Sequence, residues 1–190
     1  MVLPDHRIRA LAAEQGMIEP CAEPVSRGVV SFGISSYGYD MRLDREFRVY
    51  RPEPGRVVDP KAVDPRHFED VSGEVLALPP HTFCLGRSLE YFRIPRNIIT
   101  LCTGKSTYAR CGVLVNVTPL EPEWEGHVTM QIVNTTPAPV NLYAGEGIAQ
   151  VVFLEGSSAP EVSYADKGGK YQGSRGVTFA KTSPDRPARD

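Results

Sequence analysis

The sequence predicts a mainly β domain with one short N-terminal helix, in a Greek-key or jelly-roll arrangement. Its 190 residues are enough to bury one sizeable core, with no composition break that would indicate two domains. Its 17 glycines and 17 prolines are scattered along the chain, as expected for many short strands joined by tight turns. No repeat of about 20 to 50 residues indicates a solenoid or a propeller. We therefore expect a single domain over residues 1–190, with a mobile tail from about residue 157.

The N-terminal helix is predicted from an apolar face and two end signals. Ile8, Leu11 and Ala12 recur at helical spacing. Asp5 is placed to cap the first turn, and Gly16 supplies the stop. The pattern predicts a short amphipathic helix between these two residues.

Short apolar runs bounded by glycine, proline or aspartate predict the strands. They lie at residues 29–34, 47–50, 75–78, 82–85, 97–102, 113–117, 128–133, 140–142 and 148–153. Residues 106–111, between Gly104 and Gly112, are predicted to form one or two helical turns, and such a loop is a favourable place for a site. Beyond Gly156 the chain is polar and glycine-rich and ends in the charged run 185–190, which predicts a tail that orders partly on a ligand.

Charge and composition exclude several classes of partner. The formal net charge is -2, with 21 basic and 23 acidic residues intermixed, so we expect neither a nucleic acid nor a membrane partner. No apolar run approaches the roughly 20 residues of a membrane span, and the chain does not begin with a signal-peptide pattern. The four cysteines lack the spacing of a metal site and are expected to be reduced thiols. These features predict a soluble, cytoplasmic protein.

One cluster of polar side chains is suited to phosphate. Lys105, Ser106, Thr107 and Arg110 lie within six residues at a glycine-hinged turn, and such groups bind phosphate oxygens through charge-assisted hydrogen bonds. A P-loop is excluded because Ile99 stands where its first glycine is required. A zinc nucleobase deaminase is not expected, because the chain has no C-x-x-C element and His127 is followed by Val128 and Thr129 rather than by x-Glu. From these residues alone, a phosphate site and a solvated basic turn are both open.

Four short motifs together resemble the dCTP deaminase family. They are Ser36-Tyr37-Gly38-Tyr39-Asp40, Gly104-Lys105-Ser106-Thr107-Tyr108-Ala109-Arg110, Trp124-Glu125-Gly126-His127 and Ser163-Tyr164-Ala165-Asp166. They occur in the family's order and span almost the whole chain. The resemblance implies a distorted β-barrel of the dUTPase type and a homotrimer with active sites between subunits. It also implies hydrolytic deamination of dCTP to dUTP and ammonia in pyrimidine deoxynucleotide synthesis, with Mg²⁺ carried by the substrate triphosphate and no zinc.

The resemblance assigns roles to individual residues. Ser106 would orient the attacking water or the developing oxyanion, and Arg110 would hold the surroundings of the cytosine. The implied substrate-binding set is Lys105, Ser106, Thr107, Tyr108, Ala109, Arg110, Thr129, Met130, Gln131, Gln150, Tyr164, Lys170 and Ser174, with no metal ligand in the protein. Ser174 stands where many relatives have glutamine, so a triphosphate contact is either weakened or taken over by Arg175.

The sequence departs from the family pattern at the catalytic base. The resemblance places the glutamate that takes a proton from water at position 131, which here is Gln131. A neutral amide has no useful basicity near pH 7, and loss of a general base lowers a rate by on the order of 10²- to 10⁴-fold. We therefore expect dCTP binding with lowered or abolished turnover. Glu121, Glu123 and Glu125 are alternative carboxylates, but catalysis depends on position at the ångström level.

The sequence leaves three other functions open. The first is a dUTP diphosphatase, alone or combined with dCTP deamination. The second is a non-catalytic homologue that binds dCTP, dTTP or dUTP. The third is a β-rich trimeric protein without a ligand. Whether Gln131 is natural or was introduced to trap a substrate is also open.

Overall fold

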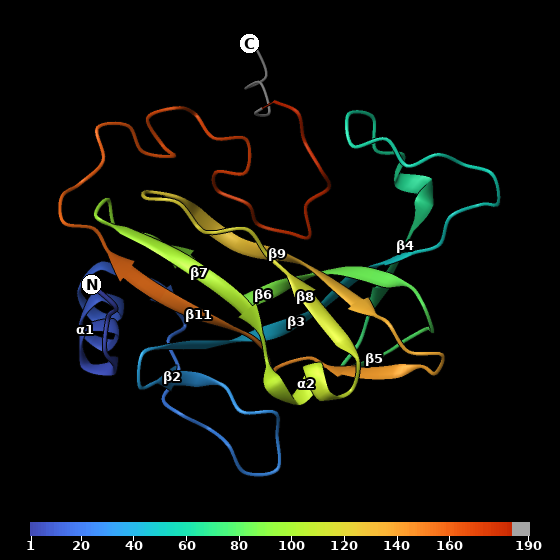
Figure 1. Cartoon of the computed structure of the whole chain (residues 1–190), viewed down its shortest axis with the longest axis horizontal. Helices are drawn as coiled ribbons and strands as arrows, with labels where there is room; N and C mark the ends of the chain where they lie inside the picture. The colour runs from blue at the N-terminus through green and yellow to red at the C-terminus, as the bar shows by residue number, and fades with distance from the viewer. Residues whose placement is uncertain (184–190) are drawn as a thin grey trace.

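Antiparallel strands form most of the fold of residues 1–183, the part of the chain that the computed structural model describes (Figure 1). The helical elements are α1 (Asp5–Gln15), the 3-10 helix η1 (Pro65–His67) and α2 (Ser106–Arg110). The strands are β1 (Ile18–Glu19), β2 (Gly33–Ser35), β3 (Gly38–Tyr50), β4 (Phe68–Ser72), β5 (Val75–Leu78), β6 (Phe83–Arg93), β7 (Ile98–Gly104), β8 (Val113–Asn116), β9 (Glu125–Asn134), β10 (Val140–Tyr143) and β11 (Gly147–Glu155). The predicted charged run 185–190 lies outside the described residues.

The main sheet curls into a nearly closed barrel. Its central path runs β7-β11-β3-β6-β9-β8, with β1, β2 and β4 paired alongside, while β5 and β10 form a separate pair. The two ends of the path approach each other, because a Cβ built on Gly104 of β7 would lie 3.4 Å from the Val115 side chain of β8. The mainly β barrel with a short N-terminal helix is thus confirmed.

Helix α1 matches its prediction except at the first turn. It buries Ile8 and Leu11, and it ends at Gly16, whose left-handed φ of 64° allows its N–H to bond the Ala12 carbonyl. The predicted cap at Asp5 is wrong. Pro4 occupies the cap position and turns the chain into the helix one residue earlier, so Asp5 is the first helical residue.

Three strands differ markedly from their predictions, one of them β6, which spans 11 residues where only residues 82–85 were predicted. The predicted strand at 29–34 is reduced to β2, because the preceding residues form a loop closed by a bridge between Val25 and Phe32. The predicted strand at 47–50 is only the end of β3, which is 13 residues long. The first part of β3 alternates apolar and charged residues, so a search for apolar runs passes over it.

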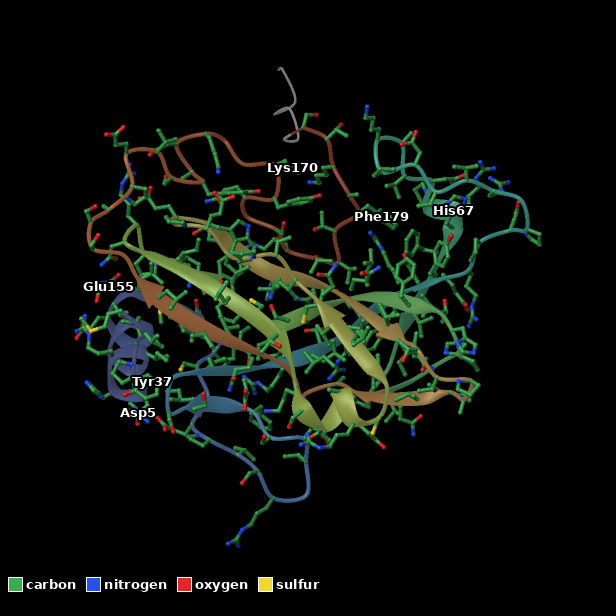
Figure 2. All side chains as sticks on the ribbon, viewed as in Figure 1. Asp5, Tyr37, His67, Glu155, Lys170 and Phe179 are labelled. Atoms are coloured by element: carbon green, nitrogen blue, oxygen red, sulfur yellow. The ribbon has the colours of Figure 1, made fainter. Side chains whose placement is uncertain are left out.

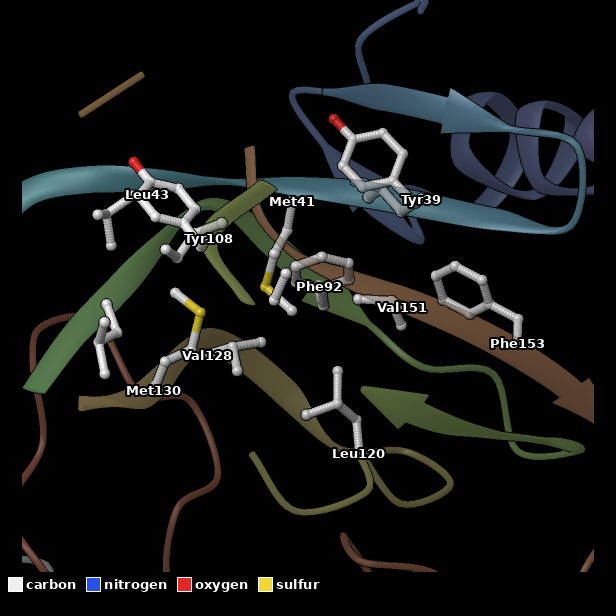
Figure 3. Packing of buried hydrophobic residues seen from close by; sticks show 14 of the residues in the cluster. Tyr39, Met41, Leu43, Phe92, Tyr108, Leu120, Val128, Met130, Val151 and Phe153 are labelled. Atoms are coloured by element: carbon white, nitrogen blue, oxygen red, sulfur yellow. The ribbon is translucent and has the colours of Figure 1, made fainter. Parts of the chain in front are cut away.

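The barrel interior is filled from β3, β6, β9 and β11 (Figure 3). Met41, Phe92, Met130 and Phe153 are fully buried there. Strand β9 alternates buried and half-buried positions, so Met130 points into the core. Its neighbours in the strand, Thr129 and Gln131, therefore emerge on the outer face.

Candidate active site

The structure places the predicted site residues in two groups. The first group surrounds α2 and comprises residues 105–110 together with Gln150 of β11. The second comprises residues 129–131 of β9 and three residues of the chain after β11, namely Tyr164, Lys170 and Ser174. Within residues 1–183, no hydrogen bond or ion pair joins a member of one group to a member of the other.

Helix α2 exposes polar side chains because Tyr108 anchors it. The Tyr108 ring is buried, its hydroxyl accepts from the Tyr143 N–H at 3.1 Å, and burial raises its pKa to about 12. Tyr108 is therefore a neutral structural anchor, and its side chain is not free for a ligand. On the exposed side of the helix lie Ser106, Thr107, Ala109 and Arg110. The Arg110 guanidinium folds back to donate to the Ser106 carbonyl at 2.9 Å.

Lys105 is held by a carboxylate that received no role in the sequence analysis. Its Nζ donates to Asp40 Oδ2 at 2.5 Å, and the two side chains are only 10% and 12% exposed. Gln150 Nε2 donates to Asp40 Oδ1 at 3.2 Å, so Asp40 fixes two predicted site residues, one that precedes α2 and one in β11. An ammonium has three N–H donors, which leaves two of those on Lys105 for a ligand. A hollow of about 390 Å³ opens beside Asp40, between α1 and the loop before β2.

Gln131 lies on the outer face of β9 opposite an amide. The antiparallel register pairs it with Asn116 of β8 on one side and with Leu85 of β6 on the other. Asn116 Nδ2 donates to Gln131 Oε1 at 3.4 Å. Met130, the residue before it, has a fully buried side chain, so only its main chain can reach a ligand.

The chain after β11 is bound along the same strand. The His127 N–H donates to the Ser174 carbonyl at 2.8 Å, and the Thr178 N–H donates to Thr129 Oγ1 at 3.1 Å. Trp124 Nε1 donates to the Tyr171 carbonyl at 3.1 Å. These contacts hold the tail along the edge of β9 at Gly126 and His127 and over its outer face at Thr129, two residues before Gln131.

The three predicted tail residues have different environments. The Tyr164 hydroxyl accepts from the Tyr171 N–H at 3.0 Å, and the Ser174 hydroxyl donates to the Tyr171 carbonyl at 2.9 Å, so both shape the tail. Lys170 is exposed, with its Nζ 5.2 Å from the centre of the Tyr171 ring. Arg175, the predicted replacement for a missing glutamine, instead lies 4.4 Å over the ring of Tyr91.

The end of the tail contacts strands β3 and β4. Arg48 Nη1 donates to the Val177 carbonyl at 2.8 Å, and the Arg48 guanidinium lies 4.0 Å over the Phe179 ring. The Phe179 ring also packs on Phe68, with ring centres 5.1 Å apart. Figure 2 shows Lys170 and Phe179 on the tail side of the molecule, away from Asp5 and Tyr37 beside α1. We call the contacts of Phe179 with Phe68 and Arg48 the tail latch.

A buried polar network beneath β9 was also missed by the sequence analysis. Glu90 of β6 is fully buried and accepts hydrogen bonds from the Tyr39 hydroxyl at 3.0 Å and from Arg42 Nε at 2.6 Å. Burial raises the pKa of Glu90, and the bonds from Arg42 oppose that rise. His127 Nδ1 lies 3.1 Å from the carbonyls of both Ser88 and Glu90, which requires that this nitrogen carries the proton. The network therefore ties β3 and β6 to the strand that carries Gln131.

The described residues contain neither a metal-binding cluster nor a membrane-spanning helix. Among residues 1–183, no group of three or more His, Cys, Asp and Glu side chains is arranged to hold a metal ion. In the same part of the chain, neither α-helix has the length and apolar character needed to cross a bilayer.

Comparison with known proteins gives a consistent picture. The family described as dCTP deaminase-like matches residues 2–156. A protein of Gemmatimonas aurantiaca named dCTP deaminase is 58% identical over 178 residues, covering 93% of this chain and 97% of the relative. A protein of Granulibacter bethesdensis with the same name is 57% identical over 181 residues, covering 95% and 98%.

A solved structure supports the fold. The crystal structure of a 2'-deoxycytidine 5'-triphosphate deaminase from Agrobacterium tumefaciens matches with a TM-score of 0.63 over 81% of this chain. This chain spans about half, 47%, of that longer chain. At 16% identity the likeness shows the fold alone. The family match and the near full-length relatives together show that this chain belongs to the dCTP deaminase-like family.

Proposed function

We propose that this chain binds dCTP at a deaminase site whose turnover is lowered or abolished by Gln131. The observation that carries the proposal is the pair of groups described above, a polar one around α2 and an outer-face one on β9. Relatives that are 58% and 57% identical over nearly their full length are named dCTP deaminase, which supports the substrate. The reaction is dCTP plus water giving dUTP plus ammonia.

The α2 group is suited to the triphosphate. Thr107 presents an exposed hydroxyl, and Lys105 retains two N–H donors beside its ion pair with Asp40. Lys170 of the tail adds an exposed ammonium. We propose that Mg²⁺ arrives bound to the triphosphate oxygens, because Asp40, the carboxylate beside Lys105, is already paired.

The two groups are proposed to meet across a subunit boundary of a homotrimer. Within residues 1–183 no hydrogen bond or ion pair joins them, and strands β7 and β8 expose apolar side chains where they approach each other. Leu101 is 53% exposed and Leu114 is 58% exposed, which favours burial against another copy. Light scattering on the purified chain should give three times the chain mass of 20.9 kDa, and Leu101→Asp should lower it. A monomer at micromolar concentration would contradict the proposal.

The chemistry assigns separate tasks to Gln131 and to two residues of α2. Water attacks C4 of the cytosine, and a base must take its proton before ammonia leaves. Gln131 stands at the position of that base and cannot hold the proton, because an amide is not basic near pH 7. Ser106 and Arg110 are proposed to orient the water and the reacting ring. Binding therefore survives the change to glutamine while the proton transfer does not.

The experiment measures dUTP and ammonia release from dCTP with Mg²⁺ beside a dCTP binding titration. We expect binding with little or no turnover, and Gln131→Glu should raise the rate by at least about 10²-fold. The control is Gln15→Glu, which makes the same change at an exposed site at the end of α1 and should leave the rate unchanged. An unchanged rate in Gln131→Glu would show that the base lies elsewhere.

A second candidate function follows from the same residue. Because Gln131 keeps its hydrogen bond to Asn116 but lacks basicity, a nucleotide-binding homologue without catalysis is also favoured. Assay of dUMP and pyrophosphate in the same reaction tests the alternative of combined deaminase and diphosphatase activity.

The four cysteines are free thiols, which supports a location in the reducing cytoplasm.

A further inference from the structure

We infer that Gln131 makes this site prefer pyrimidine deoxynucleoside triphosphates with a 4-oxo group, as in uracil and thymine, over the 4-amino base of dCTP. The inference rests on the proposed function, which places position 131 beside C4 of the bound base. The inference concerns whether the side chain at position 131 donates or accepts a hydrogen bond. This question is separate from the loss of the catalytic general base.

The barrel register forces Gln131 and Asn116 into contact. They are directly paired residues of β9 and β8, and side chains of directly paired residues on one sheet face lie about 5 Å apart at Cβ. Asn116 Nδ2 donates to Gln131 Oε1 at 3.4 Å, a long but correctly directed hydrogen bond. The oxygen end of the Gln131 amide is thereby engaged by the protein.

The amino end of the same amide is left for a ligand. On the other side of β9, the residue paired with Gln131 is Leu85, which has no polar side-chain atom. Along the outer face, Thr129 Oγ1 already accepts from the Thr178 N–H. Within residues 1–183, Gln131 Nε2 donates no hydrogen bond to the protein. This nitrogen is therefore a donor on the half-buried outer face, beside the end of the tail contacts.

A donor at this place discriminates between pyrimidines. Opposite a 4-oxo group, Gln131 Nε2 forms an N–H···O hydrogen bond. Opposite the 4-amino group of cytosine, two donors meet and neither is satisfied, whereas a glutamate carboxylate would accept from that amino group. A buried donor left without a partner lowers affinity by at least about tenfold. We therefore expect dUTP and dTTP to bind at least about tenfold more tightly than dCTP.

Asn116→Asp provides a test that leaves Gln131 in place. A carboxylate at position 116 can only accept, so it takes its hydrogen bond from Gln131 Nε2 and turns Oε1 toward the ligand. The preference should then move toward dCTP by at least about tenfold, as it should in Gln131→Glu. The control is Asn141→Asp, which adds the same charge at an exposed position of β10.

The measurement is the dissociation constant of dCTP, dUTP and dTTP for each variant, by titration calorimetry with Mg²⁺. The ratio of the constants is compared, because an added negative charge weakens all three triphosphates alike. A ratio that favours dUTP or dTTP in the unmodified chain and reverses in Asn116→Asp, but not in Asn141→Asp, supports the inference. Comparing dUTP with dTTP shows whether the site also accommodates a 5-methyl group.

Three results would overturn the inference, and they differ in whether they also affect the proposed function. A preference for dCTP in the unmodified chain, or an unchanged ratio in Asn116→Asp, overturns the inference and leaves the proposed nucleotide site intact. Failure of all three triphosphates to bind overturns the inference and the proposed function together.

Discussion

Arg42→Met should destabilise the barrel far more than an ordinary surface substitution. Arg42 Nε and the Arg42 main-chain N–H both donate to the Glu90 carboxylate, at 2.6 and 2.9 Å. The Glu90 side chain is 0% exposed and that of Arg42 is 16% exposed. Methionine preserves much of the side-chain volume while removing the guanidinium, so the main effect is an unpaired carboxylate in the interior.

The expected loss follows from what remains around Glu90. The Tyr39 hydroxyl and one main-chain N–H still donate to the carboxylate, but no cation faces it. Removing one partner of a buried ion pair lowers stability by about 3–5 kcal/mol. Adding Glu90→Gln to Arg42→Met should recover more than half of that loss, because the amide oxygen can accept from the main-chain N–H of residue 42, the amide NH2 can donate to the Tyr39 hydroxyl oxygen, and no buried charge remains.

The assay is urea unfolding followed by circular dichroism at one fixed protein concentration, since an oligomer's apparent stability depends on concentration. The matched control is Arg9→Met, which breaks the exposed ion pair between Arg9 and Glu23 and should leave the stability almost unchanged, because solvent screens such a pair. The effect of Arg42→Met should shrink at mildly acidic pH, where the unpaired carboxylate binds a proton. Equal losses in Arg42→Met and Arg9→Met would refute the reasoning.

Two further predictions concern His127 and the tail latch. Burial, assisted by the nearby Arg87 charge, lowers the pKa of His127 below its usual 6.5, so the unfolded chain binds this proton more readily than the folded one. The unfolding free energy should therefore be highest above about pH 6.5 and should fall as pH drops toward the folded-state pKa. In His127→Gln that part of the pH dependence should vanish, and parallel pH curves for the two proteins would contradict the assignment. Phe179→Ala removes the ring from its contacts with Phe68 and Arg48, so trypsin should cut the tail several-fold faster while the thermal midpoint of the barrel stays unchanged. Val162→Ala, at an exposed tail site, is the control for that digestion, and equal digestion rates would show that the latch does not hold the tail.

The elements predicted correctly are those whose residues carry their own signal. Strands β5, β7, β8, β10 and β11 are apolar runs between turn residues, and each lies within about two residues of its predicted position. The missed parts of the barrel wall carry charged residues at alternate positions. Asp40 and Arg42 in β3, and Glu90 in β6, look like solvated residues in the sequence. Their burial depends on partners from other strands, which a local pattern cannot reveal.

The same reason explains which site residues were missed. The positions of α2 and Gln131 follow from motifs that are continuous in sequence. Asp40 acts on Lys105, which is 65 residues away, and Asn116 faces Gln131 across 15 residues. Each pair exists only because the strand order and register bring it together. Resemblance to a family indicates which residues belong to a site, whereas the register of the folded chain shows what each one is bonded to.

The barrel itself places no requirement on the chemistry of position 131. Gln131 lies half-buried on the outer face of β9, while the flanking Met130 and Ile132 are fully buried and carry the packing of that strand. Glutamine and glutamate have nearly the same volume, so either can occupy the position without disturbing the core, and a match across the whole barrel is compatible with both. Under the proposed function, the fold and family set where the nucleotide binds, whereas the side chain at 131 is proposed to decide whether a proton can be taken and which base is preferred. For this reason the rate with Gln131→Glu and the binding ratio with Asn116→Asp are separate measurements, since the first reports basicity and the second reports hydrogen-bond polarity at one atom position.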